Sequence, residues 1–325
     1  MRNEPAPSEL YSPAHSGGGM IDPISLMKIK SMELRAKVIV EGFWKGIHRS
    51  PFHGFSVEFS EYRQYTPGDD PRHIDWRVYA RSDRYFIKKF QDETNLRCYL
   101  LLDHSRSMGY GSGSYTKAQY AGTLAATLAY FLFTQGDAVG LATFDDRIRQ
   151  YMPPRNRPSY LKRLMLGLEA QPEGGATDLG PPLQRIAQML TKRGLIVLVS
   201  DLLTSIDRLE TDLGYLCAGG HDVVLFQTLD PAELHFDFDT PAIFRDIESG
   251  RDMYIDPVVA QKNYQQRLEG HLAASRATCQ SLGIDYHLFA TDRPFDLALL
   301  DFLQDRMRRR KQIHRAGGSR LGRAI

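Results

Sequence analysis

Cysteine is scarce in this chain, whose 325 residues include only Cys98, Cys217 and Cys279. An odd and widely spaced set of this kind does not form a disulfide framework, and it lacks the paired spacing of a zinc knuckle. Disulfides are rare in reducing compartments, so this cysteine usage favours a cytoplasmic protein.

Long hydrophobic runs are also missing. The longest nearly apolar stretch covers residues 124–133, is interrupted by Thr127, and falls well short of the roughly 20 residues that span a bilayer. The N-terminus is rich in Pro, Ser and Gly and has no apolar core of a secretory signal. We therefore expect no membrane span, and we expect residues 1–22 to form a disordered leader.

Charge of one sign is not in excess, because 41 Lys and Arg stand against 39 Asp and Glu, a net charge of +2. With 27 Gly and 17 Pro there is no low-complexity bias, and 42% of the residues are hydrophobic. These values exclude a disordered or collagen-like chain and indicate an ordinary globular protein with one large domain or two modest ones.

The small net charge hides an uneven distribution. Residues 306–325 carry eight Lys or Arg and no Asp or Glu, and subtracting these eight from 41 leaves 33 basic against 39 acidic residues. Clustered cations are one route to nucleic-acid binding, through the release of phosphate counterions. No aromatic residues interleave with them as a base-stacking platform would require. We therefore favour a solvated helix end followed by a flexible basic tail at residues 311–325.

We expect residues 23–95 to form an N-terminal segment of one helix and short strands, distinct from the domain that follows. Asp22 followed by Pro23 predicts the start of an amphipathic N-terminal helix. Farther on, alternation at residues 55–59 and 85–87 predicts short strands, with a turn at residues 66–70. The Arg- and Asp-rich strip 61–97 either faces a partner or forms a structural ion-pair network around Trp76 and Tyr79, and we favour the network.

From residue 96 onward, strand-like and helix-like segments alternate. Predicted strands are 98–102, 138–144, 195–200, 223–228 and 286–290, and predicted helices are 117–134, 159–168, 179–190, 205–217, 258–282 and 295–310. This alternation predicts an α/β domain at residues 96–310, with a mostly parallel sheet and helices on both faces.

Polar residues follow the predicted strands where such sheets bind ligands, beyond the carboxyl ends. Asp103, Ser105 and Ser107 come after one strand, Asp201 after another, and Thr177 lies in a loop before a helix. All of these side chains offer hard oxygen atoms, which suit Mg²⁺ or Mn²⁺ better than zinc or copper. If the backbone stays extended, Asp103, Ser105 and Ser107 point to one side. His104 and Arg106 then point away, and we assign them no catalytic role.

In chain order, Asp103-x-Ser105-x-Ser107, Thr177 and Asp201 resemble the metal-ion-dependent adhesion site of von Willebrand factor A domains. The upstream segment 65–72 (YTPGDDPR), followed by Ile74-Asp75-Trp76 and Ala80-Arg81, resembles the signature of the bacterial family filed as domain of unknown function 58, DUF58. The resemblance extends over about residues 40–303. Because no membrane span is expected, the chain is similar to the shorter, soluble branch of that family.

The resemblance implies a von Willebrand factor A-like (Rossmann-like) fold and a non-enzymatic, Mg²⁺-dependent protein-binding module. It further implies action beside a MoxR-type AAA+ ATPase in the assembly, maturation or activation of client proteins. Ser105, Ser107 and Thr177 would bind the metal through hydroxyls, while Asp103 and Asp201 would act largely through bound water. An acidic side chain of the partner would complete the coordination.

Other interpretations remain open. Asp103, Ser105 and Ser107 are also residue types that form caps and turns, and Asp178 either supports the metal site or caps the following helix. A metal-assisted phosphohydrolase using Asp103 is a weaker alternative, since Ser105 stands where a second Asp is expected and no lysine or base motif is evident. Binding of nucleic acid through the basic tail is a third hypothesis.

Overall fold

The structure, a computed structural model, describes residues 22–49, 62–64, 86–88, 96–170, 178–236, 238, 240–245 and 251–303. The chain forms two compact units, Met1–Phe43 together with Leu96–Ile325, and Trp44–Asn95. Within the second unit, strands β1 (Tyr62–Gln64) and β2 (Phe86–Lys88) pair antiparallel. The strand predicted at 85–87 corresponds to β2, whereas the strand at 55–59 and the turn at 66–70 lie outside the described residues.

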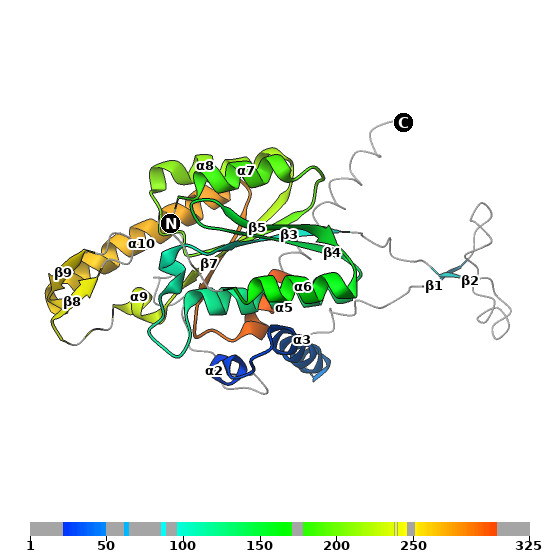
Figure 1. The fold of residues 1–325 in the computed structure, drawn as a ribbon, viewed down its shortest axis with the longest axis horizontal. Coiled ribbons are helices and arrows are strands. Elements are labelled where there is room, and N and C mark those ends of the chain that lie inside the picture. The colour runs from blue at the N-terminus through cyan, green and yellow to red at the C-terminus, as the bar shows by residue number, and fades with distance from the viewer. Residues whose placement is uncertain are drawn as a thin grey trace. The chain divides into compact units, whose positions relative to one another are not determined.

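A six-stranded sheet forms the centre of the first unit, with the strand order β10-β7-β6-β3-β4-β5 (Figure 1). Its strands are β3 (Arg97–Asp103), β4 (Ala138–Phe144), β5 (Ile148–Arg155), β6 (Leu195–Ser200), β7 (Asp222–Leu229) and β10 (Asp285–Ala290). All neighbouring pairs are parallel except β4 and β5, which run antiparallel. The mostly parallel sheet is therefore confirmed, and β5 is an additional edge strand that the sequence pattern did not predict.

Helices cover both faces of this sheet (Figure 1). On one face lie α5 (Lys117–Thr134) and α6 (Pro158–Leu168), and on the other lie α7 (Gly180–Met189) and α8 (Ile206–Ala218). Helix α10 (Pro257–Ser281) packs against α8, and residues 295–303 are helical. Each of these helices coincides within a few residues with a predicted one, apart from the segment 304–310, which lies outside the described residues. The predicted α/β fold class is confirmed.

The N-terminal helix is divided in two, which corrects the prediction of one helix. Asp22 caps α2 (Pro23–Met27) by accepting from the amides of Ile24 and Ser25, and α3 (Met32–Arg49) then begins anew. The reason is a second cap, because the hydroxyl of Ser31 accepts from the amide of Leu34 at the start of α3.

The first turn of α3 contacts α5 and the end of α6. The guanidinium of Arg35 donates to Thr123 Oγ1 at 2.7 Å, and Glu169 Oε1, after the end of α6, accepts from the amide of Met32 at 3.1 Å. Layers on both sides explain why α5 is buried around nearly its whole circumference and carries the longest apolar stretch of the chain. In the described part of the chain, no helix combines the length and apolarity needed to cross a membrane.

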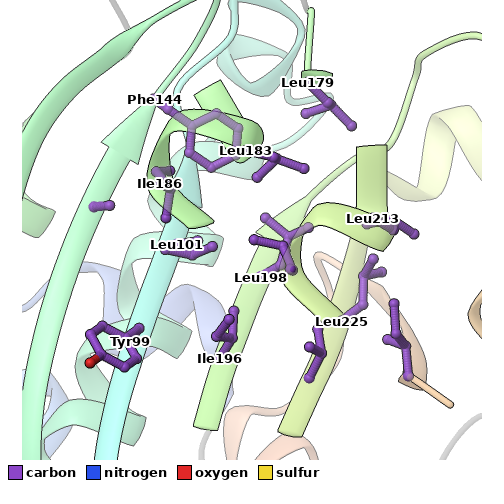
Figure 2. Packing of buried hydrophobic residues seen from close by; sticks show 14 of the residues in the cluster. Tyr99, Leu101, Phe144, Leu179, Leu183, Ile186, Ile196, Leu198, Leu213 and Leu225 are labelled. Atoms are coloured by element: carbon purple, nitrogen blue, oxygen red, sulfur yellow. The ribbon is translucent and has the colours of Figure 1, made fainter. Parts of the chain in front are cut away.

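Hydrophobic side chains fill the space between the sheet and helices α7 and α8. Figure 2 shows side chains of β3, β6 and β7 meeting those of the two helices; the labelled residues include Leu101, Ile196, Leu198, Leu183, Leu213 and Leu225. Along β3, Tyr99 and Leu101 belong to this layer, while Leu100 and Leu102 are buried on the opposite face. Burial on both faces accounts for the continuous apolar runs of the parallel strands.

An antiparallel hairpin that the sequence pattern did not predict lies between the short helix α9 (Pro231–His235) and α10. It consists of β8 (Ala242–Arg245) and β9 (Asp252–Ile255). Phe236 stacks on Tyr264 of α10 and on Phe244 of the hairpin, with ring centroids 4.6 and 6.0 Å apart. Aromatic packing therefore attaches the hairpin to both helices.

The sheet order places a topological switch point between β3 and β6. From β3 the chain continues to β4 on one side, whereas β6 pairs with β3 on the other. In open α/β sheets, ligands bind beyond the carboxyl ends of the strands at such a point. Asp103 ends β3 and is followed by the turn to Ser107, and Ser200 ends β6 and is followed by Asp201, which makes this edge the candidate site.

Candidate functional site

Asp103 is the last residue of β3, and its side chain is fully buried. One carboxylate oxygen, Oδ1, accepts from the amide of Ser105 at 2.8 Å, and the other, Oδ2, accepts from Ser200 Oγ at 2.6 Å. Ser200 ends the neighbouring strand β6, so this carboxylate joins the two strand ends at the switch point.

Ser105 and Ser107 lie in the turn that leaves β3, where a short 3-10 helix covers Arg106–Gly109. Both side chains are buried, and their hydroxyl oxygens are 3.1 Å apart. The two predicted hydroxyl ligands are therefore neighbours. Arg106, between them, is exposed.

His104 is buried in the same turn, and its backbone amide donates to the carbonyl of Phe144 at the end of β4. Burial lowers the pKa of its imidazole, and the nearby carboxylate of Asp145 opposes that shift. Asp145 is itself paired with Arg149, whose Nε donates to Asp145 Oδ2 at 2.7 Å. These contacts attach the turn after β3 to the end of β4 and hold the loop that follows β4.

Asp201 follows β6 and is fully buried beside the switch point. Its Oδ1 accepts from the amide of Leu203 at 3.2 Å, and its backbone carbonyl accepts from Gln227 Nε2 at 2.8 Å. The amide oxygen of Gln227 in turn accepts from the hydroxyl of Tyr286 at 2.7 Å. Buried polar groups of β7 and β10 thus hold the loop that carries Asp201.

Leu202, directly after Asp201, adopts a left-handed backbone conformation with φ of 52°. A branched-chain residue rarely takes this conformation, which costs about 1–3 kcal/mol. The side chain is fully buried, and the backbone carbonyl accepts from His271 Nε2 of α10 at 2.9 Å. Tertiary contacts thus hold a strained turn at the candidate site.

A buried lysine completes the surroundings of Asp201. The ammonium of Lys117, the first residue of α5, donates to Asp201 Oδ2 at 2.8 Å and to Glu233 Oε1 at 2.7 Å. Burial alone would lower the pKa of Lys117, but Asp201 and Glu233 together raise it. The lysine therefore stays charged, with no exposed side-chain surface.

Asp103 has an unusual pKa for a carboxyl group. Burial raises it to about 7, and the negative charge of Asp201 adds to the effect. Two carboxylates that approach each other in a buried setting favour a proton or a cation between them. A cation at this edge would thus relieve the charge that burial makes unfavourable.

The donor set fits a hard divalent cation. It combines two carboxylates, Asp103 and Asp201, with the adjacent hydroxyls of Ser105 and Ser107, all of them oxygen donors of the kind that Mg²⁺ selects. No group of three or more His, Cys, Asp or Glu side chains suited to a metal occurs among the described residues.

Thr177, the fifth predicted ligand, lies outside the described residues. Its neighbour Asp178 is described, and Asp178 Oδ1 accepts from the amide of Gly180 at the first turn of α7, at 3.3 Å. Asp178 lies one residue before the N-cap position, Leu179, so this hydrogen bond supports the start of the helix from just outside it. The basic tail at residues 311–325 and most of the strip 61–97 also lie outside the described residues.

Sequence reasoning missed Lys117 and Glu233. Two signals were available, because a lysine in the first turn of a helix has the wrong sign for the helix dipole, and Asp230 to Glu233 matches the spacing of a capping box. The structure has this box, with Asp230 as the cap of α9. Lys117 is a lysine at the candidate site that no sequence motif indicated. Its ammonium, however, binds Asp201 and Glu233, and it is fully buried.

Comparisons with known proteins identify relatives over most of the chain. The sequence profile of the family described as "Protein of unknown function DUF58" matches residues 61–278. The uncharacterized protein Rv1480 of Mycobacterium tuberculosis (strain ATCC 25618 / H37Rv) is 25% identical over 313 residues, which are 95% of this chain and 98% of the relative.

Solved structures with related folds are more distant. An aerotolerance-related membrane protein from Bacteroides fragilis NCTC 9343 matches with a TM-score of 0.42 and 14% identity, over 64% of this chain and 97% of that one. The VWA domain of SpRpn10 matches with a TM-score of 0.37 and 13% identity, over 63% and 93%. At such TM-scores, these likenesses add no weight to the topology and site described above.

Proposed function

This chain belongs to the family of proteins of unknown function DUF58, and from that premise we propose that it is a non-enzymatic, Mg²⁺-dependent protein-binding module. The binding surface is the carboxyl edge of the sheet around Asp103, Ser105, Ser107 and Asp201. Thr177 completes the proposed ligand set.

One observation carries the proposal, namely the hydrogen bond between Ser200 and Asp103 at 2.6 Å. It brings the turn after β3 and the turn after β6 together, although the two residues are 97 positions apart in the sequence. The adjacent hydroxyls of Ser105 and Ser107 and the carboxylate of Asp201 belong to these same two turns. Four of the five proposed ligands thus come from one small part of the edge.

The hydrogen bonds suggest a division of roles. Both carboxylate oxygens of Asp103 and both of Asp201 already accept from protein donors, so these groups supply mainly negative charge. Ser105 and Ser107 supply neutral oxygens for direct contact. When bound, Mg²⁺ would offer a positively charged coordination position to a carboxylate of the partner.

We propose a MoxR-type AAA+ ATPase and a client protein as the partners, with assembly, maturation or activation of the client as the outcome. The support is the family membership together with the motif resemblance. A cytoplasmic location belongs to the same proposal. It is supported by the three cysteines, none of which forms a disulfide.

Calorimetry on the full chain tests the proposal. Titration with MgCl₂ alone should show binding, and an acetylated pentaglutamate peptide should bind only when Mg²⁺ is present. A MoxR-type ATPase from the same genome should co-purify with the chain in Mg²⁺ and dissociate in EDTA. Absence of divalent-ion binding by the wild-type chain would refute the mechanism, and Mg²⁺-dependent hydrolysis of p-nitrophenyl phosphate would support the phosphohydrolase instead.

A further inference from the structure

Lys117 is placed where a lysine is costly. It is the first residue of α5, where the helix dipole disfavours a positive charge, and its side chain is completely buried. Two carboxylates hold it, Asp201 at 2.8 Å and Glu233 at 2.7 Å. Stability alone is a weak reason for such a cluster, because well-packed apolar residues of similar volume often stabilise a fold equally well.

The cluster connects the candidate site to α9. Glu233 binds Lys117 through Oε1, and its Oε2 accepts from the amide of Asp230 at 2.8 Å. Asp230 also accepts from the amide of Ser112 at 3.0 Å, in the loop between Asp103 and α5. The amide of Asp230 and the ammonium of Lys117 thus hold the two oxygens of Glu233. Glu233 in turn keeps the ammonium in place beside Asp201.

The net charge around Lys117 affects which ligands the site can bind. When ionised, Asp103, Asp201 and Glu233 carry three negative charges against the one positive charge of Lys117. A divalent ion makes this group of charges neutral. Without the lysine, the same ion would lie beside an excess of negative charge and would attract a further carboxylate less.

We propose that Lys117 is a positioning residue that sets the site's preference for an acidic partner, by holding Asp201 and cancelling its charge. This inference rests on the proposed function. The lysine does not touch the partner, because its side chain is buried. It acts through Asp201, so that the bound divalent ion keeps enough positive charge to bind a carboxylate.

A charge series tests this role in the full chain. Lys117→Met removes one positive charge from the site, Glu233→Gln removes one negative charge, and the double variant restores the wild-type net charge. The matched control is Lys162→Met, on the exposed side of α6. Each protein is titrated with MgCl₂, and then, in saturating Mg²⁺, with acetylated pentaglutamate. All titrations are made at the same pH, 8.

The expected changes have opposite signs for the two ligands. Lys117→Met should bind Mg²⁺ roughly tenfold more tightly and the peptide roughly tenfold more weakly, because one nearby charge shifts such equilibria by about this factor or more. Glu233→Gln should shift both affinities in the reverse directions. The double variant should return to within about threefold of wild type, and Lys162→Met should match wild type.

A merely structural lysine would give a different result. If both single variants weaken Mg²⁺ and peptide binding in parallel, or if Glu233→Gln changes neither, the inference is wrong while the proposed function stands. If the wild-type chain binds no divalent ion, both this inference and the proposed function are wrong. Should Lys117→Met fail to fold, Glu233→Gln and the double variant still decide between the two outcomes.

Discussion

Ser200 Oγ donates a hydrogen bond of 2.6 Å to Asp103 Oδ2, and this contact joins the ends of strands β6 and β3. The hydroxyl of Ser200 also accepts from the amide of Leu202 at 3.0 Å, within the strained turn after β6. One serine therefore fixes the carboxylate of one strand to the backbone of the next. The candidate site is held in shape by the protein itself, as a preorganised binding site requires.

The raised pKa of Asp103 predicts a pH-dependent stability in EDTA. Burial, with the charge of Asp201, raises it from 3.8 to about 7. The folded chain then retains a proton that the unfolded chain releases, so this stabilisation is complete below about pH 4 and is lost as the pH rises through 7. Asp103→Asn should remove that dependence.

Urea denaturation from pH 4.5 to 8 measures this effect. The control is Asp207→Asn, the same change at an exposed position in the first turn of α8, which should keep the wild-type slope. An unaltered slope in Asp103→Asn would show that this carboxyl group does not titrate in the way its surroundings predict.

Ser105 and Ser107 should matter for metal binding more than for stability. Their hydroxyls hydrogen-bond to each other at 3.1 Å, and the double change Ser105→Ala with Ser107→Ala removes both partners of that bond. Loss of both partners typically costs little, about 1 kcal/mol. We expect Mg²⁺ affinity in calorimetry to fall by at least tenfold, with a nearly unchanged melting temperature. An unchanged Mg²⁺ affinity would show that these hydroxyls do not bind the metal.

The buried cluster around Lys117 predicts strongly non-additive stabilities. Lys117→Met leaves Asp201 and Glu233 as buried charges without their cation, and should lower the free energy of unfolding by about 3–5 kcal/mol. Adding Glu233→Gln removes one of those charges and should recover part of the loss. Guanidinium denaturation of the two single variants and the double variant measures the coupling. Additive changes would mean that the ion pairs contribute little.

Leu101, in the middle of β3, tests the core between the sheet and α7 and α8. Its side chain is 1% exposed, and Leu101→Ala should cost about 2–5 kcal/mol through lost burial and the cavity that remains. Leu166→Ala on α6 is the matched control, since that side chain is 61% exposed. It should change stability by less than about 1 kcal/mol. Similar losses in both variants, measured by urea denaturation, would contradict the placement of the core.

The sequence predicted the parallel strands and the long helices because their periodicity reflects burial directly. Elements at the edge of the fold, whose residues are only partly buried, were predicted less well. Strand β5 carries Pro153 and Pro154 near its end, which obscures a strand pattern that an edge position tolerates. The division between α2 and α3 depended on Ser31 acting as a cap in a segment with helical periodicity on both sides.

Among the site residues, Asp103, Ser105, Ser107 and Asp201 were predicted from their places after strands, and the structure brings them to one edge. Lys117 was not predicted, because its partners lie 84 and 116 positions away in the sequence. A pattern read along the chain shows that a charged residue opens an apolar helix. It does not show which distant carboxylates neutralise that residue.

By itself, the sequence determined the alternation of strands and helices and the positions of oxygen-bearing residues after the strands, since local periodicity and side-chain chemistry carry that information. Tertiary structure alone decided which strand ends meet. The order β6-β3-β4 puts Asp103 beside Ser200 and Asp201, and helix packing inserts the ammonium of Lys117 behind them. The charge balance of the site depends on this packing, because electrostatic interactions follow distance through space and burial, not separation along the chain.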